Sequence, residues 1–145
     1  MPDIDSTNIE GRWTEPAVGL LRIVTALLFL EHGTSKILSF PPTAASDPPM
    51  WTLFWVAGWL ELLGGLLLVG GLFTRWVAFV LAGEMAVAYW MVHAPKSPFP
   101  VLNGGESAIL FCFIFLMFVA TGPGAWSLDS VLRKRIPEEV GYRAH

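Results

Sequence analysis

The chain has 145 residues, of which 54% are hydrophobic and only 14% charged, and its mean hydropathy is +0.56. A soluble domain of this length has too much surface for its volume to hide so many apolar side chains, so the composition indicates a single-domain integral membrane protein. The net charge of −3, without a long basic block, predicts no nucleic-acid partner, and the single cysteine, Cys112, excludes an intramolecular disulfide.

Long apolar runs, each able to cross a hydrocarbon core, predict four transmembrane helices. They cover approximately residues 17–38, 51–73, 76–93 and 104–121. Backbone polar groups in lipid must be satisfied within the segment, so we predict an all-α membrane domain over 17–126, arranged as an up-down four-helix bundle. Residues 1–16 are acidic and do not resemble a cleaved signal peptide, and residues 127–145 form a polar tail.

The basic residues near the ends of these runs indicate an orientation. One side of the membrane is expected to hold Arg12, Arg75, Arg133, Lys134, Arg135 and Arg143, and the other side Lys36 and Lys96. The second and third runs are joined by a tight turn at Thr74-Arg75, whereas the other two connections are long and rich in proline. We therefore expect both termini in the cytoplasm and both Pro-rich loops outside.

Ionisable residues inside the runs are the candidate functional residues, because a charge at the bilayer centre costs about 2.5–3.5 kcal/mol on insertion scales. They are Arg22, Glu31, His32, Lys36, Glu61, Glu84, His93 and Glu106. His32 and Lys36 share one helix face. Gly58 and Gly65 flank Glu61 and favour close helix approach, so Glu61 is expected to point into the bundle and reach His32 or Lys36. Most of the set falls in the middle and one half of the membrane, which predicts a polar interior that opens outward.

Several of these residues also have simpler explanations. Arg22 and Lys36 are placed where a long side chain can extend to the membrane surface. Asn103-Gly-Gly-Glu106 has the spacing of a capping box, with Glu106 at the N3 position. His93 lies at a helix end where it can bond to the adjoining loop. No group of residues has the spacing of a metal site.

Together, these motifs resemble the DoxX family of small four-helix bacterial membrane proteins, over approximately residues 18–130. The motifs are Arg22, His32-Gly-x-x-Lys36, Glu61-Leu-Leu-Gly-Gly, Thr74-Arg75, His93, Asn103-Gly-Gly-Glu106 and Gly122-Pro-Gly-Ala-Trp-Ser-Leu-Asp129. The resemblance implies the bacterial inner membrane and an association with quinone-linked oxidoreduction. It also implies a partner subunit, because the chain itself encodes no electron acceptor.

The leading hypothesis is a redox-associated subunit that binds a quinone or a similar lipophilic molecule. His32 is expected to bond to a quinone carbonyl, Glu61 to take a proton, and Lys36 to polarise the oxygen, so these are the candidate catalytic residues. The candidate ligand-binding residues are Arg22, Glu31, Glu84, His93, Asn103 and Glu106.

Other functions remain open at this point. Buried acids and histidines are also typical of proton-coupled transport of small solutes, which in so short a chain predicts a homo-oligomer. Another open function is that of a structural or assembly subunit of a membrane oxidoreductase complex, without catalysis of its own. The weakest alternative is a haem held between His32 and His93.

Overall fold

The computed structural model describes the backbone of residues 6–135 and the side chains of residues 13–134. The ends of the expected N-terminal segment and C-terminal tail, Arg143 among them, lie outside the described residues, as do the side chains of Arg12 and Arg135. Within 6–135 the secondary structure is helical, without strands. The predicted all-α class is therefore confirmed for this part of the chain.

Six α-helices and one π-helical turn follow one another along residues 6–135. They are α1 (Ser6–Leu38), α2 (Leu53–Gly70), α3 (Thr74–Ala88), η1 (Tyr89–His93), α4 (Pro100–Asn103), α5 (Glu106–Thr121) and α6 (Leu128–Arg135). By length and apolar composition, three stretches can cross a membrane: Trp13–Leu38, Leu53–Gly70 and Thr74–His93. The fourth expected span corresponds to α5, which is apolar but only 16 residues long.

The helices begin and end at different residues from the expected runs where backbone conformation, and not hydropathy, sets the boundary. Helix α1 begins at Ser6 and continues through Pro16. The predicted turn at Thr74-Arg75 is displaced: Gly71 takes a left-handed conformation (φ 64°) and ends α2, and Thr74 is already the first residue of α3. A glycine just past the last helical residue is the usual stop signal, because it has no Cβ to clash in that conformation.

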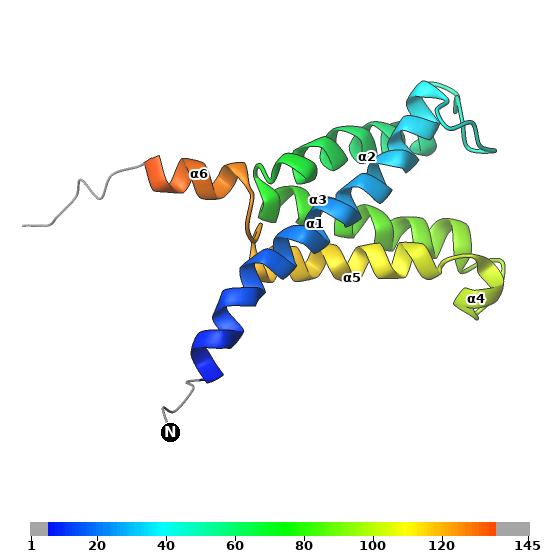
Figure 1. Ribbon diagram of the computed structural model, residues 1–145. Coiled ribbons are helices and arrows are strands. Elements are labelled where there is room, and N and C mark those ends of the chain that lie inside the picture. The colour runs from blue at the N-terminus through cyan, green and yellow to red at the C-terminus, as the bar shows by residue number, and fades with distance from the viewer. Residues whose placement is uncertain (1–5, 136–145) are drawn as a thin grey trace, which may run out of the picture.

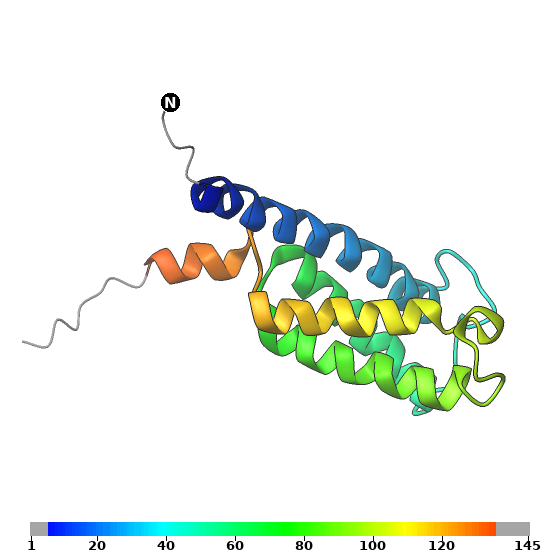
Figure 2. The same cartoon turned by 90° about the horizontal axis from the view of Figure 1, so that it is seen from below.

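The helices associate mainly as two pairs, α1 with α2 and α3 with α5. Both long loops, 39–52 and 94–105, lie at one end of the molecule, and the α2–α3 turn, α6 and the start of α1 lie at the other (Figures 1 and 2). Buried apolar side chains fill the interior, among them Phe29, Leu68, Leu81, Phe115 and Phe118. Within the first pair, Gly33 of α1 lies directly against the backbone of Glu61 and Leu62 in α2. This close approach brings Glu61 next to α1.

Candidate functional site

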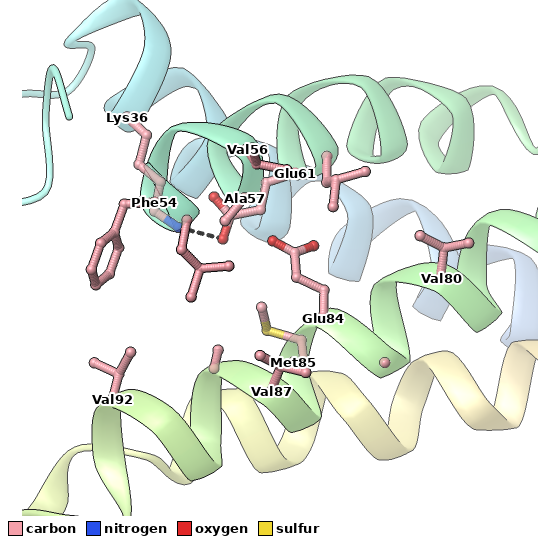
Figure 3. Close-up of a pocket in the computed structure, with 14 residues that line it drawn as sticks. Lys36, Phe54, Val56, Ala57, Glu61, Val80, Glu84, Met85, Val87 and Val92 are labelled. Carbon is pink, nitrogen blue, oxygen red and sulfur yellow. Dashed lines mark hydrogen bonds and ion pairs between the residues drawn. The ribbon is translucent and has the colours of Figure 1, made fainter. Parts of the chain in front are cut away.

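A cavity of about 260 Å³ lies between α2 and α3 (Figure 3). Its walls are largely aliphatic and aromatic. The lining includes Leu53, Phe54, Val56, Ala57, Leu60, Val80, Met85, Val87, Ala88 and Val92. The charged residues in the lining are Lys36, Glu61 and Glu84. An apolar pocket with a few convergent polar groups is the usual form of a small-molecule site.

Lys36 and Glu61 form a buried ion pair at this cavity. Lys36 Nζ lies 2.6 Å from Glu61 Oε1, and the two side chains are 14% and 3% exposed. The expected contact between these residues is confirmed, and the glycines contribute to it as expected: a Cβ at Gly58 would collide with Lys36 and Ile37 of α1. The second carboxylate oxygen, Glu61 Oε2, is buried without a hydrogen-bond partner among the described residues.

Glu84 projects from α3 into the same cavity and points toward Glu61 (Figure 3). Both of its carboxyl oxygens are buried, and neither has a hydrogen-bond partner in the described part of the chain. Buried polar atoms are nearly always paired in folded proteins. The unpaired oxygens of Glu61 and Glu84 therefore make this cavity the candidate binding site.

A second pocket, of about 130 Å³, shares part of its lining with the first. Lys36 and Glu61 line both pockets, and His32 and His93 join them in the second. The His32 ring lies edge-on to Phe111, with 5.9 Å between ring centroids. His93 Nδ1 is 3.1 Å from the backbone oxygen of Asn103, so it makes the expected contact with the adjoining loop.

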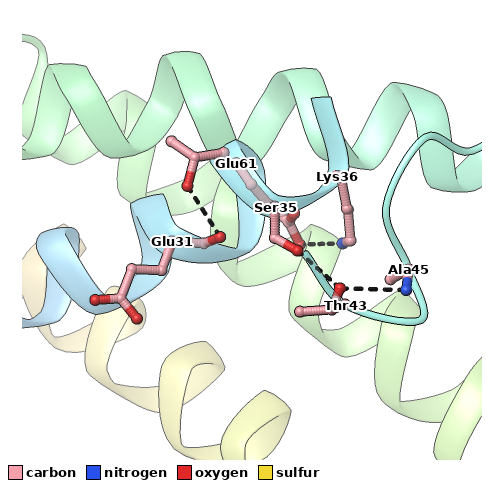
Figure 4. A network of polar contacts seen from close by, with 7 residues as sticks. Glu31, Ser35, Lys36, Thr43, Ala45 and Glu61 are labelled. Carbon is pink, nitrogen blue, oxygen red and sulfur yellow. Dashed lines mark hydrogen bonds and ion pairs between the residues drawn. The ribbon is translucent and has the colours of Figure 1, made fainter. Parts of the chain in front are cut away.

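A third pocket, of about 160 Å³, lies where the first Pro-rich loop folds back over α1. It is lined by Glu31, His32, Ser35, Lys36, Pro41, Thr43 and Ala45. The Ser35 and Thr43 hydroxyl oxygens are 2.7 Å apart, which ties the loop to the helix (Figure 4). The exposed Glu31 carboxylate points away from the Lys36–Glu61 pair (Figure 4).

Arg22 does not belong to this group of pockets. Its side chain is fully buried, and its five N–H donors are engaged by backbone carbonyls. The acceptors are the oxygens of Leu68 and Val69 at the end of α2 and of Pro123, Ala125 and Trp126 after α5. The interpretation that Arg22 extends to the membrane surface is wrong, because carbonyls at the end of α2 and in the segment after α5 hold its guanidinium inside.

Asn103 and Glu106 also lie apart from the cavity. The Asn103 side chain donates to Ser97 O (2.8 Å) and accepts from Gly105 N (2.7 Å), which organises the loop before α5. Glu106 is the exposed first residue of α5, and its N-cap is Gly105. The predicted capping box is wrong, because Gly104 is left-handed (φ 70°) and interrupts the helix that the box requires.

Sequence reasoning missed the apolar residues that shape these pockets. Phe54, Met85 and Val92 line both the first and the second pocket. Met85 and Val92 are seven residues apart, the spacing of one helix face, and that signal was present in the sequence. Hydropathy alone does not separate a residue facing a cavity from one facing lipid.

Comparisons with known proteins place the chain in a family. The DoxX family model matches residues 17–94, which include the residues of the ion pair, Glu84 and both internal histidines. An uncharacterised protein of Haemophilus influenzae is 43% identical over 127 residues, covering 81% of this chain and 92% of that protein. Inner membrane protein YqjF of Escherichia coli is 31% identical over 132 residues, covering 81% and 95%. No solved structure matches the chain. The family model covers more than half of this chain, and the Haemophilus influenzae protein matches it over 92% of that protein's length. The chain therefore belongs to the DoxX family of membrane proteins.

Proposed function

We propose that the protein crosses the bacterial inner membrane four times, through α1, α2, α3 with η1, and α5. Both termini would then face the cytoplasm and both Pro-rich loops the outside. The two long loops lie at the opposite end of the molecule from the start of α1 and from α6, which supports this arrangement (Figure 2). Arg75, Arg133 and Lys134 lie toward the end with the termini and Lys96 toward the other, which favours that end as the cytoplasmic one. The Escherichia coli relative is named as an inner membrane protein, which favours the inner membrane for this chain as well.

We further propose that this protein binds a quinone, or a similar lipophilic molecule with carbonyl groups, between α2 and α3. The observation that carries the proposal is the apolar cavity of about 260 Å³ with a buried Lys36–Glu61 pair in its wall. A quinone ring is flat and apolar, and its carbonyl oxygens need hydrogen-bond donors. The Lys36 ammonium has three donors, of which one serves Glu61.

In this proposal the residues of the cavity bind the ligand and handle its protons. Lys36 donates to a carbonyl oxygen, and Glu61 accepts a proton from a quinol hydroxyl through its unpaired Oε2. His32, which lines the adjoining pocket, passes protons onward. The two electrons released by a quinol would go to a redox cofactor of a partner subunit, so the chain acts as one subunit of a membrane oxidoreductase complex.

The test is the ligand content of the purified protein. The protein is extracted in mild detergent, its organic extract is analysed for quinones by mass spectrometry, and a short-chain ubiquinone is titrated into the quinone-depleted protein. We expect a quinone at stoichiometric level in the wild type. When the depleted protein is titrated with the reduced ubiquinol instead, Glu61→Gln should weaken binding about 10–100-fold, because the quinol hydroxyl loses a hydrogen bond to a charged group, which contributes about 1.5–3 kcal/mol.

The matched control is Glu106→Gln, which removes a carboxylate outside the three pockets and should leave binding unchanged. Gel filtration and circular dichroism report whether each variant folds. If the wild-type extract holds only lipid and the short-chain ubiquinone does not bind, the quinone proposal fails. Solute transport or a purely structural role in a complex would then be the better reading of the buried charges.

A further inference from the structure

Lys36 borders all three pockets described above. The cavity between α2 and α3 shares the Lys36–Glu61 pair with the second pocket, and the second pocket shares Lys36 and His32 with the third. The smaller two have volumes of about 130 and 160 Å³, against roughly 30 Å³ for one water molecule. The three pockets therefore form a series along α1, from the cavity toward the Pro-rich loop, and each has room for water.

The charges at the start of this route do not balance. Lys36 is the only cation among the described residues that line the cavity, and Glu61 Oε1 already pairs with it at 2.6 Å. Glu84 contributes a second carboxyl group whose two oxygens are buried without a partner in the described structure. An ionised carboxylate left unpaired in a buried site is strongly unfavourable, whereas a protonated one is neutral and has a hydrogen to donate.

We propose that Glu84 holds the exchangeable proton of the cavity, and that this proton reaches water at the loop end through the pockets joined by Lys36. The proton passes from the Glu84 carboxyl to water or Glu61, moves past His32 in the second pocket, and leaves by the third pocket beside Glu31. Each transfer moves one proton between oxygen or nitrogen atoms and changes no oxidation state. The route gives the proposed quinone site a connection to the aqueous phase, and in that sense it rests on the proposed function.

His32 is an exposed side chain that the second and third pockets share. It lines the second and third pockets and is held between Phe29 and Phe111, with ring centroids 6.4 and 5.9 Å away. Its two ring nitrogens can accept and donate a proton in turn. The other titratable groups facing the pockets are Glu31 and Lys36 of α1, Glu61 of α2 and His93 of η1.

The experiment is infrared spectroscopy of the ligand-free protein in detergent at neutral pH, so its result does not depend on whether a quinone binds. A protonated carboxyl group absorbs above the amide I band, and the band shifts when its proton is replaced by deuterium. We expect the band in the wild type and its loss in Glu84→Gln. After rapid dilution into D2O, the shift should be several-fold slower in His32→Phe, which replaces the imidazole shared by the second and third pockets with an apolar ring.

Two control variants keep the interpretation specific. His32→Gln retains a polar side chain at this position and should exchange at close to the wild-type rate. Glu106→Gln removes a carboxylate at the loop end but outside the pockets, and it should change neither the band nor its rate of exchange. A wild type without the band, or a band that survives Glu84→Gln, would overturn the assignment of the proton to Glu84. Equal exchange rates in His32→Phe and the wild type would overturn the route.

Discussion

At the scale of single residues, the buried Lys36–Glu61 pair has a measurable signature in stability. Breaking a buried pair by removing one partner typically costs about 3–5 kcal/mol, because the other charge stays buried and uncompensated, whereas replacing both partners with apolar residues can be nearly neutral. We therefore expect Lys36→Met and Glu61→Leu each to lower the stability markedly. The double variant should recover much of the loss, measured as SDS-induced unfolding in mixed micelles.

The double-mutant cycle isolates the coupling between the two side chains. If the double variant loses the sum of the two single losses, the residues act independently, and the pair does not organise the cavity. This pair was predictable from the sequence, because Gly58 and Gly65 mark the face of α2 that α1 approaches. The role of Arg22 was not, since its acceptors at Pro123, Ala125 and Trp126 lie about a hundred residues away along the chain.

At the scale of helices, α6 caps the start of α3. Asp129 Oδ1 accepts a hydrogen bond from Phe73 N (2.8 Å), and Oδ2 accepts one from Thr74 N (2.9 Å). The N-cap residue Phe73 has a positive φ of 50° and no side chain that caps. Asp129 therefore satisfies N–H groups that the first turn of a helix leaves free.

We expect Asp129→Ala to destabilise the protein by about 0.5–2 kcal/mol, the range measured for removal of N-cap side chains. Asp129→Asn keeps one acceptor oxygen, so its stability should lie between those of the wild type and the alanine variant. The measurement is thermal unfolding in detergent, followed by circular dichroism. Equal unfolding temperatures for all three proteins would mean that α3 does not need the cap.

The helices also show where sequence reasoning succeeds and where it stops. Hydropathy located α2 and the stretch 74–93 to within about three residues, since long apolar runs are a strong signal. It did not place the turn at Gly71–Phe73, which depends on a left-handed glycine and on the side chain of Asp129. The cap on α3 comes from 55 residues away, beyond the reach of any local pattern.

At the scale of the whole molecule, the two-pair arrangement accounts for the position of the cavity. Helix α1 packs mainly on α2, and α3 mainly on α5, so the α2–α3 boundary is the less tightly packed interface. The cavity opens there, and the polar route runs from it toward the end that carries the Pro-rich loops. Hydropathy did not predict the cavity, because it does not fix the rotation of a helix or the order of its neighbours, whereas the depths of the ionisable residues did predict a polar interior toward the loop end.

The side of the membrane that this end faces then decides where a released proton goes. In a Cys112→Ala background, we expect single cysteines at Ala44→Cys and Pro98→Cys to react with a membrane-impermeant maleimide added to cells whose outer membrane has been made permeable. Lys134→Cys, an exposed position on α6 at the opposite end, should react only after the inner membrane is also permeabilised. The reverse pattern would invert the proposed topology, because the basic residues near the termini would then lie outside, against the usual bias. It would also turn the route inward, so that protons from the cavity would enter the cytoplasm instead of leaving the cell.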